Sequence, residues 1–243
     1  MCAPRPVGAQ TIATSLLWTH GTRVEPIWRS CELALLYGAL PLVFAGAVNR
    51  IGYRGAMFPI LWIIALLCIS VMLSDPAFDR ASLWRLPLRH AHVTLMALRW
   101  LVLSSLLAIA VRLVSPRAFA RFPRENPRFF AFFVVGYPFL SALPQGIIWR
   151  LFFAYRYASL FGTRTALVAA GAAAFALAHI TFRNVLALLL TALGGAFFLD
   201  TYLTTGSMCL ATLEHGAYGV AAFGLGLGEF LYLGARGRGA GRR

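Results

Sequence analysis

The sequence contains no lysine and few acidic residues. Its 22 basic residues are therefore all arginines, and they stand against only eight aspartates and glutamates, which gives a formal net charge of +14. Charged residues of all kinds make up 12% of the chain, whereas ~25% is typical of soluble domains. Because 60% of the residues are hydrophobic, the composition excludes an intrinsically disordered chain and an ordinary cytosolic enzyme.

Cysteine is also scarce. The four cysteines are Cys2, Cys31, Cys68 and Cys209, and no two of them form a CxxC pair. This number and spacing exclude a small secreted disulfide scaffold. Because at least two of them lie inside apolar runs, we expect small, buried side chains.

Long apolar runs, in contrast, are abundant, and the mean hydropathy is +0.74. About 20 apolar residues in a helix cross the hydrocarbon core of a membrane. The stretch 129–157 is too long for one simple span, so we predict one helix that ends near Ser141 and a second that starts near Pro144. The other predicted spans are residues 31–48, 56–73, 93–114, 165–180, 184–199 and 207–233. These runs lack the period-two alternation of barrel strands, which predicts an all-α, polytopic transmembrane bundle of about seven or eight helices.

Composition divides the chain into four parts. We predict a polar N-terminal segment over 1–28, transmembrane helices over 29–128, a core of helices over 129–233, and a basic Gly/Arg tail over 234–243. The arginines stand between the apolar runs, as is typical of loops that meet anionic headgroups, so we expect the lipid bilayer and no nucleic acid as a partner. They occupy nearly every connector, and the orientation in the membrane therefore stays open.

Three polar residues stand out because polar groups within membrane helices are costly and indicate a partner or a function. His179 ends a run of small residues, and His215 follows Glu214 in a late apolar run. Taken alone, each histidine is more often a hydrogen-bonded structural residue than a ligand. Two of them beside small residues favour a shared ion, since neutral imidazole is the commonest metal ligand and small residues let helices approach closely. Arg150 fits a side chain that snorkels to the interface as well as one that turns inward.

Together these segments resemble the CPBP family of intramembrane metalloproteases, which includes the CAAX prenyl proteases and the bacterial Abi proteins. The motifs of that family are Glu-Glu-x-x-x-Arg, Phe-x-x-x-His and His-x-x-x-Asn, in this order. Arg150 matches the first motif, Phe175 and His179 match the second, and His215 matches the third. The resemblance covers about residues 130–220.

The chain departs from this pattern at three positions. The paired glutamates of the family fall on Gln145 and Gly146, and the asparagine of the third motif falls on Gly219. A bacterial subgroup with Pro-Gln-Glu at motif one and Glu-His-Ala-Leu-Tyr-Gly at motif three is similar to this chain. By that comparison only Gly146 is anomalous.

The resemblance implies peptide hydrolysis by a water that a glutamate and two histidines position on a divalent metal, for which we expect zinc. It makes His179 and His215 metal ligands, with Phe175, Gly146 and Gly219 as supporting positions. Arg150 would orient a neighbour or the substrate. Gln145 can form hydrogen bonds but cannot accept the proton.

The expected proton acceptor is therefore missing, and three replacements are open. Glu214 is adjacent to His215, although neighbours on a helix point about 100° apart. Asp200 and Glu229 lie near the ends of spans and could fold inward. A histidine could act as the base without a metal.

Three functions follow from these alternatives. The first is an intramembrane metalloendopeptidase that cleaves a membrane-associated peptide or protein. The second is a catalytically inactive pseudoprotease that serves as a membrane scaffold or accessory protein. The third is a transporter-like bundle in which Arg150 faces an anionic solute. All three place the chain within a membrane, and the preference for arginine over lysine suggests the bacterial inner (cytoplasmic) membrane.

Overall fold

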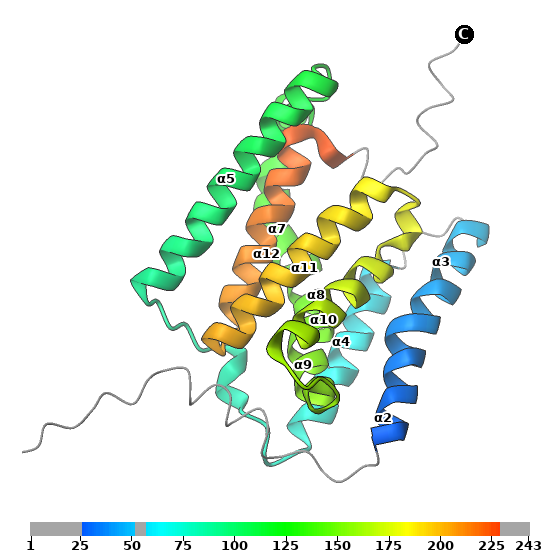
Figure 1. Ribbon diagram of the computed structural model, residues 1–243. Helices are drawn as coiled ribbons and strands as arrows, with labels where there is room; N and C mark the ends of the chain where they lie inside the picture. Colours follow the sequence, from blue (N-terminus) through cyan, green and yellow to red (C-terminus); the bar gives the residue numbers. More distant parts are fainter. Residues whose placement is uncertain (1–25, 52–56, 229–243) are drawn as a thin grey trace, which may run out of the picture.

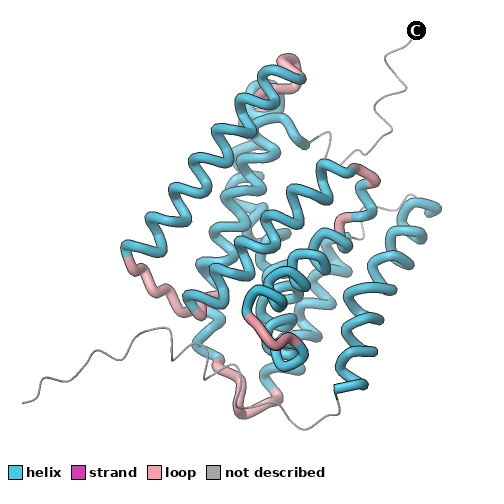
Figure 2. The backbone as a smooth tube through the Cα atoms, viewed as in Figure 1, coloured by secondary structure: helices cyan, strands magenta, loops and turns pink. Residues whose placement is uncertain are grey.

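The computed structural model describes residues 26–51 and 57–228. Within these ranges the chain forms eight helices and no strand, and the helices pack side by side as one bundle (Figures 1 and 2). Five of them are long and apolar enough to cross a membrane. The predicted all-α transmembrane bundle is confirmed, whereas the division of the chain into four parts stays a prediction. Cys2, Glu229 and the tail over 234–243 lie outside the described residues.

The first two helical rods correspond to the first two predicted spans. The first rod consists of α2 (Pro26–Leu33), the π-helical turn η1 (Ala34–Ala39) and α3 (Leu40–Ile51), and the second is α4 (Met57–Leu73). Pro26 occupies the first position of its helix, where the missing amide hydrogen costs nothing. Cys31 is exposed and Cys68 is buried, so the expectation of buried cysteines holds for Cys68 and is wrong for Cys31.

A polar connector leads to the most isolated helix of the bundle. It contains a short 3-10 helix, η2 (Arg80–Leu83), which begins where the Asp79 carboxylate accepts a hydrogen bond from the amide of Ala81. The following α5 (His90–Val114) runs along the outside of the bundle (Figure 1), and only Val111 on it is buried. Its exposed leucines are therefore available to lipid.

One long helix crosses the bundle where two were expected. Its successive segments are α7 (Pro127–Tyr137), η3 (Pro138–Ala142), α8 (Leu143–Gly146), η4 (Ile147–Phe152) and α9 (Phe153–Tyr157), and they form one continuous helix over Pro127–Leu160. The predicted break between Ser141 and Pro144 is wrong. The two prolines inside this helix lie in or next to the π-helical turns η3 and η4. These wider turns change the pattern of backbone hydrogen bonds, so the missing amide hydrogen of a proline does not end the helix.

The remaining helices carry the histidines. They are α10 (Arg164–Ala178), the 3-10 turn η6 (Ile180–Phe182), α11 (Val185–Thr205), α12 (Met208–Ala222) and the turn η7 (Phe223–Leu227), with the short α6 (Arg121–Glu125) before α7. Gly206, with φ of +62°, ends α11 in the left-handed conformation that suits glycine, and Ser207 caps α12 by accepting from the amide of Leu210. This turn brings α12 back beside α11.

Small residues bring α10 and α11 together, as the sequence predicted. A Cβ atom on Gly195 would lie 3.2 Å from the Cα atom of Ala172, and one on Gly171 would lie 2.4 Å from Leu199. Backbones that approach this closely are typical of membrane helices with small residues at their interface.

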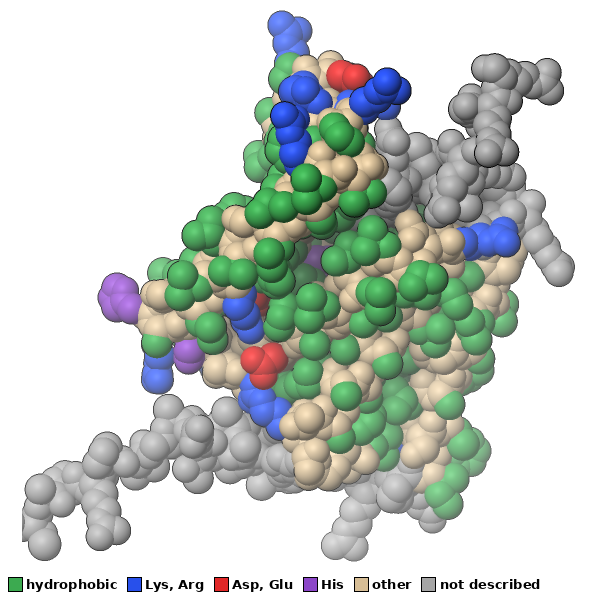
Figure 3. All heavy atoms as spheres, turned by 45° about the horizontal axis from the view of Figure 1, so that its top comes forward, with side chains coloured by type: hydrophobic (Ala, Val, Ile, Leu, Met, Phe, Trp, Pro, Cys, Tyr) green, Lys and Arg blue, Asp and Glu red, His purple; other side chains and the backbone are tan. Residues whose placement is uncertain are grey.

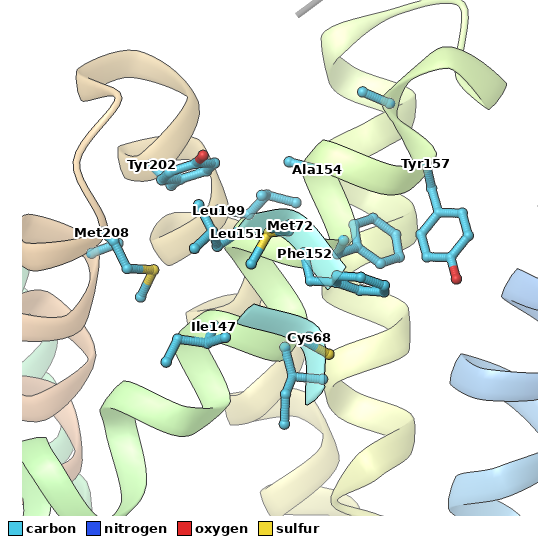
Figure 4. Packing of buried hydrophobic residues seen from close by; sticks show 14 of the residues in the cluster. Cys68, Met72, Ile147, Leu151, Phe152, Ala154, Tyr157, Leu199, Tyr202 and Met208 are labelled. Atoms are coloured by element: carbon cyan, nitrogen blue, oxygen red, sulfur yellow. The ribbon is translucent and has the colours of Figure 1, made fainter. Parts of the chain in front are cut away.

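The core lies between α4, η4, α9 and α11. Figure 4 shows Cys68 and Met72 of α4 beside Leu151 and Phe152, with Leu199 of α11 close to Leu151. The outer surface is largely apolar along the sides of the molecule, and arginines gather at the end that holds α6 (Figure 3). With large apolar side chains exposed along α5 and α11, the chain is an integral membrane protein whose surroundings are the lipid bilayer.

Candidate functional site

Arg150 is turned into the bundle. Its side chain, on η4, is 1% exposed, so the snorkelling alternative is wrong. Its guanidinium carbon lies 4.0 Å from the ring centroid of Phe175 on α10 and 4.9 Å from that of Phe198 on α11. Contacts of this kind stabilise a cation by the negative faces of aromatic rings. None of the three guanidinium nitrogens has a hydrogen-bond partner.

The same two rings connect Arg150 to both histidines. Phe175 contacts His179 with centroids 4.6 Å apart and the edge of His215 at 5.5 Å, while Phe198 stacks on His215 at 4.7 Å. The three polar residues singled out in the sequence are thus brought together around one pair of phenylalanines. Phe175, expected as a supporting residue of the second motif, lies at the centre of the group.

The imidazoles of the two histidines have different neighbours. The Nδ1 atom of His179 lies 2.7 Å from the carbonyl oxygen of Phe175. A carbonyl only accepts hydrogen bonds, so Nδ1 carries the proton and the lone pair is on Nε2. The His215 imidazole is buried and interacts with the backbone of Ala142.

Gln145 and Gly146 lie one turn before Arg150. The Gln145 amide donates to the Ser141 hydroxyl at 2.8 Å, and its oxygen Oε1 is buried without a partner. Gly146 faces α12, where a Cβ atom would lie 2.1 Å from the terminal methyl carbon of Met208 and 3.3 Å from the hydroxyl of Thr212. The Met208 side chain therefore fills the place of the missing glutamate.

Gly219 faces a different kind of neighbour. A Cβ atom at this position would lie 2.1 Å from Cε1 of Tyr137, 2.4 Å from Cζ and 2.6 Å from the hydroxyl oxygen. The same ring contacts His215 edge-on at 6.2 Å. Sequence reasoning missed Tyr137, because nothing in the local pattern around it indicates that an aromatic ring occupies the asparagine position.

Glu214, the preferred replacement for the proton acceptor, is engaged elsewhere. Its carboxylate is buried and accepts from the Arg99 guanidinium at 2.8 Å and from the Thr201 hydroxyl at 2.5 Å. Arg99 lies on α5 and also donates to Thr201 at 3.0 Å. Sequence reasoning missed Arg99, although an arginine in the middle of the predicted span 93–114 was a signal that could have found it.

The other described carboxylates also have partners. Two of the eight acidic residues, Glu25 and Glu229, lie outside the described residues, so the part of the second replacement that involved Glu229 is not decided. Asp200 pairs with Arg164 at 2.6 Å and so does not fold inward. The remaining four are engaged as follows: Glu32 by Arg156, Asp75 by Tyr155, Asp79 by Arg85 and Glu125 by Arg121. Each described carboxylate is therefore held by a partner other than the two histidines.

The donor set for a metal is incomplete among the residues that the structure describes. They contain no group of three histidines, cysteines or acids that could hold an ion, whereas catalytic zinc takes three protein ligands. His179 and His215 supply two imidazoles, and the permanently charged Arg150 packs on the same rings. Zinc stays a prediction.

Comparison with known proteins agrees with the resemblance seen in the motifs. Residues 127–221 match the family of type II CAAX prenyl endopeptidase Rce1-like proteins. The match begins at α7 and ends within α12, so it contains the helices that carry Arg150, His179 and His215. No curated protein and no solved structure matches the chain. The predicted resemblance is confirmed over residues 127–221, where the chain is similar to the CAAX-protease family.

Proposed function

We propose that this chain binds a membrane-associated peptide or protein in its CAAX-protease-like site without hydrolysing it. The observation that carries the proposal is the glycine at position 146, where Met208 fills the space beside Arg150. The other motif residues of the site, Arg150, His179 and His215, match the family pattern. A site that keeps its polar groups but lacks a proton acceptor is suited to recognition.

The unpartnered atoms of the site match the needs of a peptide backbone. Arg150 and the Thr212 hydroxyl can donate, whereas Gln145 Oε1 and His179 Nε2 can accept. Phe175 and Phe198 supply apolar walls. Pockets that combine apolar walls with a few convergent polar groups are typical binding sites, and an unpartnered buried polar atom gains most when a ligand completes its hydrogen bonds.

Hydrolysis needs more than this arrangement supplies. A water that attacks a peptide bond must lose a proton to a base, and positioned bases contribute about 10²–10⁴-fold in rate. Gln145 cannot take the proton. Glu214 is held by Arg99 and Thr201, and Asp200 is held by Arg164.

A second candidate, an intramembrane endopeptidase with a histidine as the base, is favoured by one observation. The hydrogen bond of His179 to Phe175 leaves Nε2 unprotonated, and a neutral imidazole can accept a proton. In this candidate Arg150 and Gln145 would stabilise the developing oxyanion.

One experiment separates the two candidates. The probe is a prenylated peptide with a photo-crosslinking residue, incubated with the full chain in detergent; capture and cleavage are both read by mass spectrometry. We expect the wild type to capture the peptide without cleaving it and Gly146→Glu to cleave it, with cleavage lost in Gly146→Glu/His179→Ala. Cleavage by the wild type that His179→Ala abolishes would establish the endopeptidase. Capture no greater than that of a scrambled soluble peptide would contradict both candidates.

We also propose the bacterial inner membrane as the location, which the arginine-for-lysine bias supports. The anionic headgroups of such a membrane suit the arginines on the connectors. Expression of a reporter fusion in a bacterium, followed by separation of inner and outer membranes, tests this. Recovery in the outer-membrane fraction would contradict it.

A further inference from the structure

Arg150 is a buried cation whose hydrogen bonds are unmade. The residue is 1% exposed, and its Nε, Nη1 and Nη2 atoms all lack a partner. Phe175 and Phe198 contact its faces, but the five N–H groups of a guanidinium point outward in its plane and still require acceptors. A buried charge whose hydrogen bonds are unmade is costly, so this geometry indicates that an acceptor from outside the chain completes the site.

The place for that acceptor lies one turn before Arg150. Residues 145 and 146 precede it by five and four positions, and in a helix with a π-helical turn both spacings bring side chains near one another. Gln145 presents an amide there, and Gly146 presents nothing. The space that a side chain at position 146 would use is occupied by the far end of Met208, an unbranched and flexible side chain that can rotate away.

Another unpartnered polar atom borders the same space. The Thr212 hydroxyl lies 3.3 Å from the Cβ position of residue 146 and is buried without a partner. His215, one turn further along α12, contacts the same two phenylalanine rings as Arg150. A guanidinium only donates hydrogen bonds and a hydroxyl can also donate one, so the two groups suit a negatively charged ligand with two acceptor atoms.

We propose that this space binds a carboxylate, held by the Arg150 guanidinium and the Thr212 hydroxyl. Planar, bidentate pairing with a carboxylate is the interaction for which a guanidinium is best shaped. The carboxylate comes either from a small free acid or from the partner peptide, at its C-terminus or on an acidic side chain. Only the second source rests on the proposed function.

The test measures thermal unfolding of the full chain in detergent, with sodium formate titrated against sodium chloride at equal ionic strength. At a formate concentration of about ten times the dissociation constant, the wild-type Tm should rise by about 3–5 °C. The rise is absent in Arg150→Leu, and it is absent in Gly146→Glu, which supplies its own carboxylate. Met208→Ala opens the space and increases the response at low formate. Arg164→Leu is the control, because Arg164 is exposed and already pairs with a carboxylate. This variant should show the same rise in Tm as the wild type.

Three results would overturn the proposal: no shift with formate, an equal shift with chloride, or an equal shift in Gly146→Glu. The last comparison holds even if Arg150→Leu does not fold. A second readout does not depend on unfolding. The NMR signal of ¹³C-formate should broaden when the protein is added, because formate binds to it.

The source of the carboxylate is distinguished with the crosslinking peptide. A peptide with a free C-terminus that is captured better than its amidated form, and displaced by formate, identifies the peptide C-terminus as the source. A formate shift with no capture of either peptide supports a free acid and contradicts the proposed function alone. Capture of both peptides without any formate shift contradicts the carboxylate site alone.

Discussion

Arg99 and Arg150 both reach into the helical bundle, and they differ in their hydrogen-bond partners. Arg99 on α5 reaches α12 and α11, where it pairs with the Glu214 carboxylate at 2.8 Å and donates to Thr201. Arg150 on η4 is more deeply buried, contacts two phenylalanine rings and has no acceptor. The Glu214 carboxylate, which the sequence suggested for the site, instead pairs with Arg99 and holds α5 against the bundle.

We propose that Arg99 serves the fold and that Arg150 serves the site. A buried ion pair is complete within the chain, and breaking it leaves a charge behind. A buried cation without a hydrogen-bond acceptor is costly to the fold, and under this proposal a bound ligand offsets that cost. The predictions below test this distinction, beginning with the largest expected effect.

Removing Arg99 should be the most damaging of the changes. Arg99→Leu leaves Glu214 buried with only Thr201 as a partner, and we expect unfolding to be easier by about 3–5 kcal/mol. Denaturant unfolding in mixed micelles measures this. Arg99→Leu/Glu214→Gln removes both charges and recovers part of the loss. A cost below about 1 kcal/mol would show that the pair behaves like a surface ion pair.

The two glycines that replace motif residues should respond differently to restoration. Gly219→Asn meets the rigid ring of Tyr137, and we expect a loss of about 1–3 kcal/mol from overpacking. Gly146→Glu meets the flexible end of Met208 and the Thr212 hydroxyl at 3.3 Å, and it should not show this loss because the methionine can rotate away. The matched control, Gly219→Asn/Tyr137→Ala, has room for the side chain. Equal stability of Gly219→Asn and the wild type would contradict the geometry.

Replacing Arg150 should change stability much less than replacing Arg99. Arg150→Leu removes contacts with Phe175 and Phe198 that are worth about 0.5–2 kcal/mol, but it also removes an unpaired buried charge, so the two effects offset each other. The free energy of unfolding, measured in the absence of carboxylates, should stay within about 1 kcal/mol of the wild type. A loss as large as that of Arg99→Leu would mean that Arg150 has an internal partner.

An exposed ion pair gives the smallest effect and calibrates the scale. Arg164 and Asp200 pair at 2.6 Å with nearly half of each side chain exposed. Arg164→Leu should cost about 0.2–1 kcal/mol, and the cost should fall in high salt. A larger cost that does not depend on salt would mean that this pair behaves like the buried pair of Arg99 and Glu214, and it would contradict the prediction.

The membrane class and the helical bundle could be predicted because both follow from composition and from the length of apolar runs. The three motifs also predicted which helices meet, and the structure places Arg150, His179 and His215 around Phe175 and Phe198. The break near Pro144 was wrong because π-helical turns absorb the prolines, and no local signal distinguishes such a turn from a helix end.

The rest of the site depends on contacts between distant parts of the chain. The pairing of Arg99 with Glu214 joins residues that are 115 positions apart, and sequence periodicity carries no information about it. In the same way, the identity of Gly146 and Gly219 showed that side chains were missing. Only the packing shows that Met208 fills one space and Tyr137 the other.

The central claim is that Arg150 lacks the carboxylate that position 146 could supply. A double-mutant cycle between Gly146→Glu and Arg150→Leu, read as the free energy of unfolding in the absence of added carboxylates, tests it most directly. We predict that Gly146→Glu is more favourable by about 1–3 kcal/mol when Arg150 is present than when it is leucine. A coupling below about 0.5 kcal/mol, the range of independent sites, would contradict the claim.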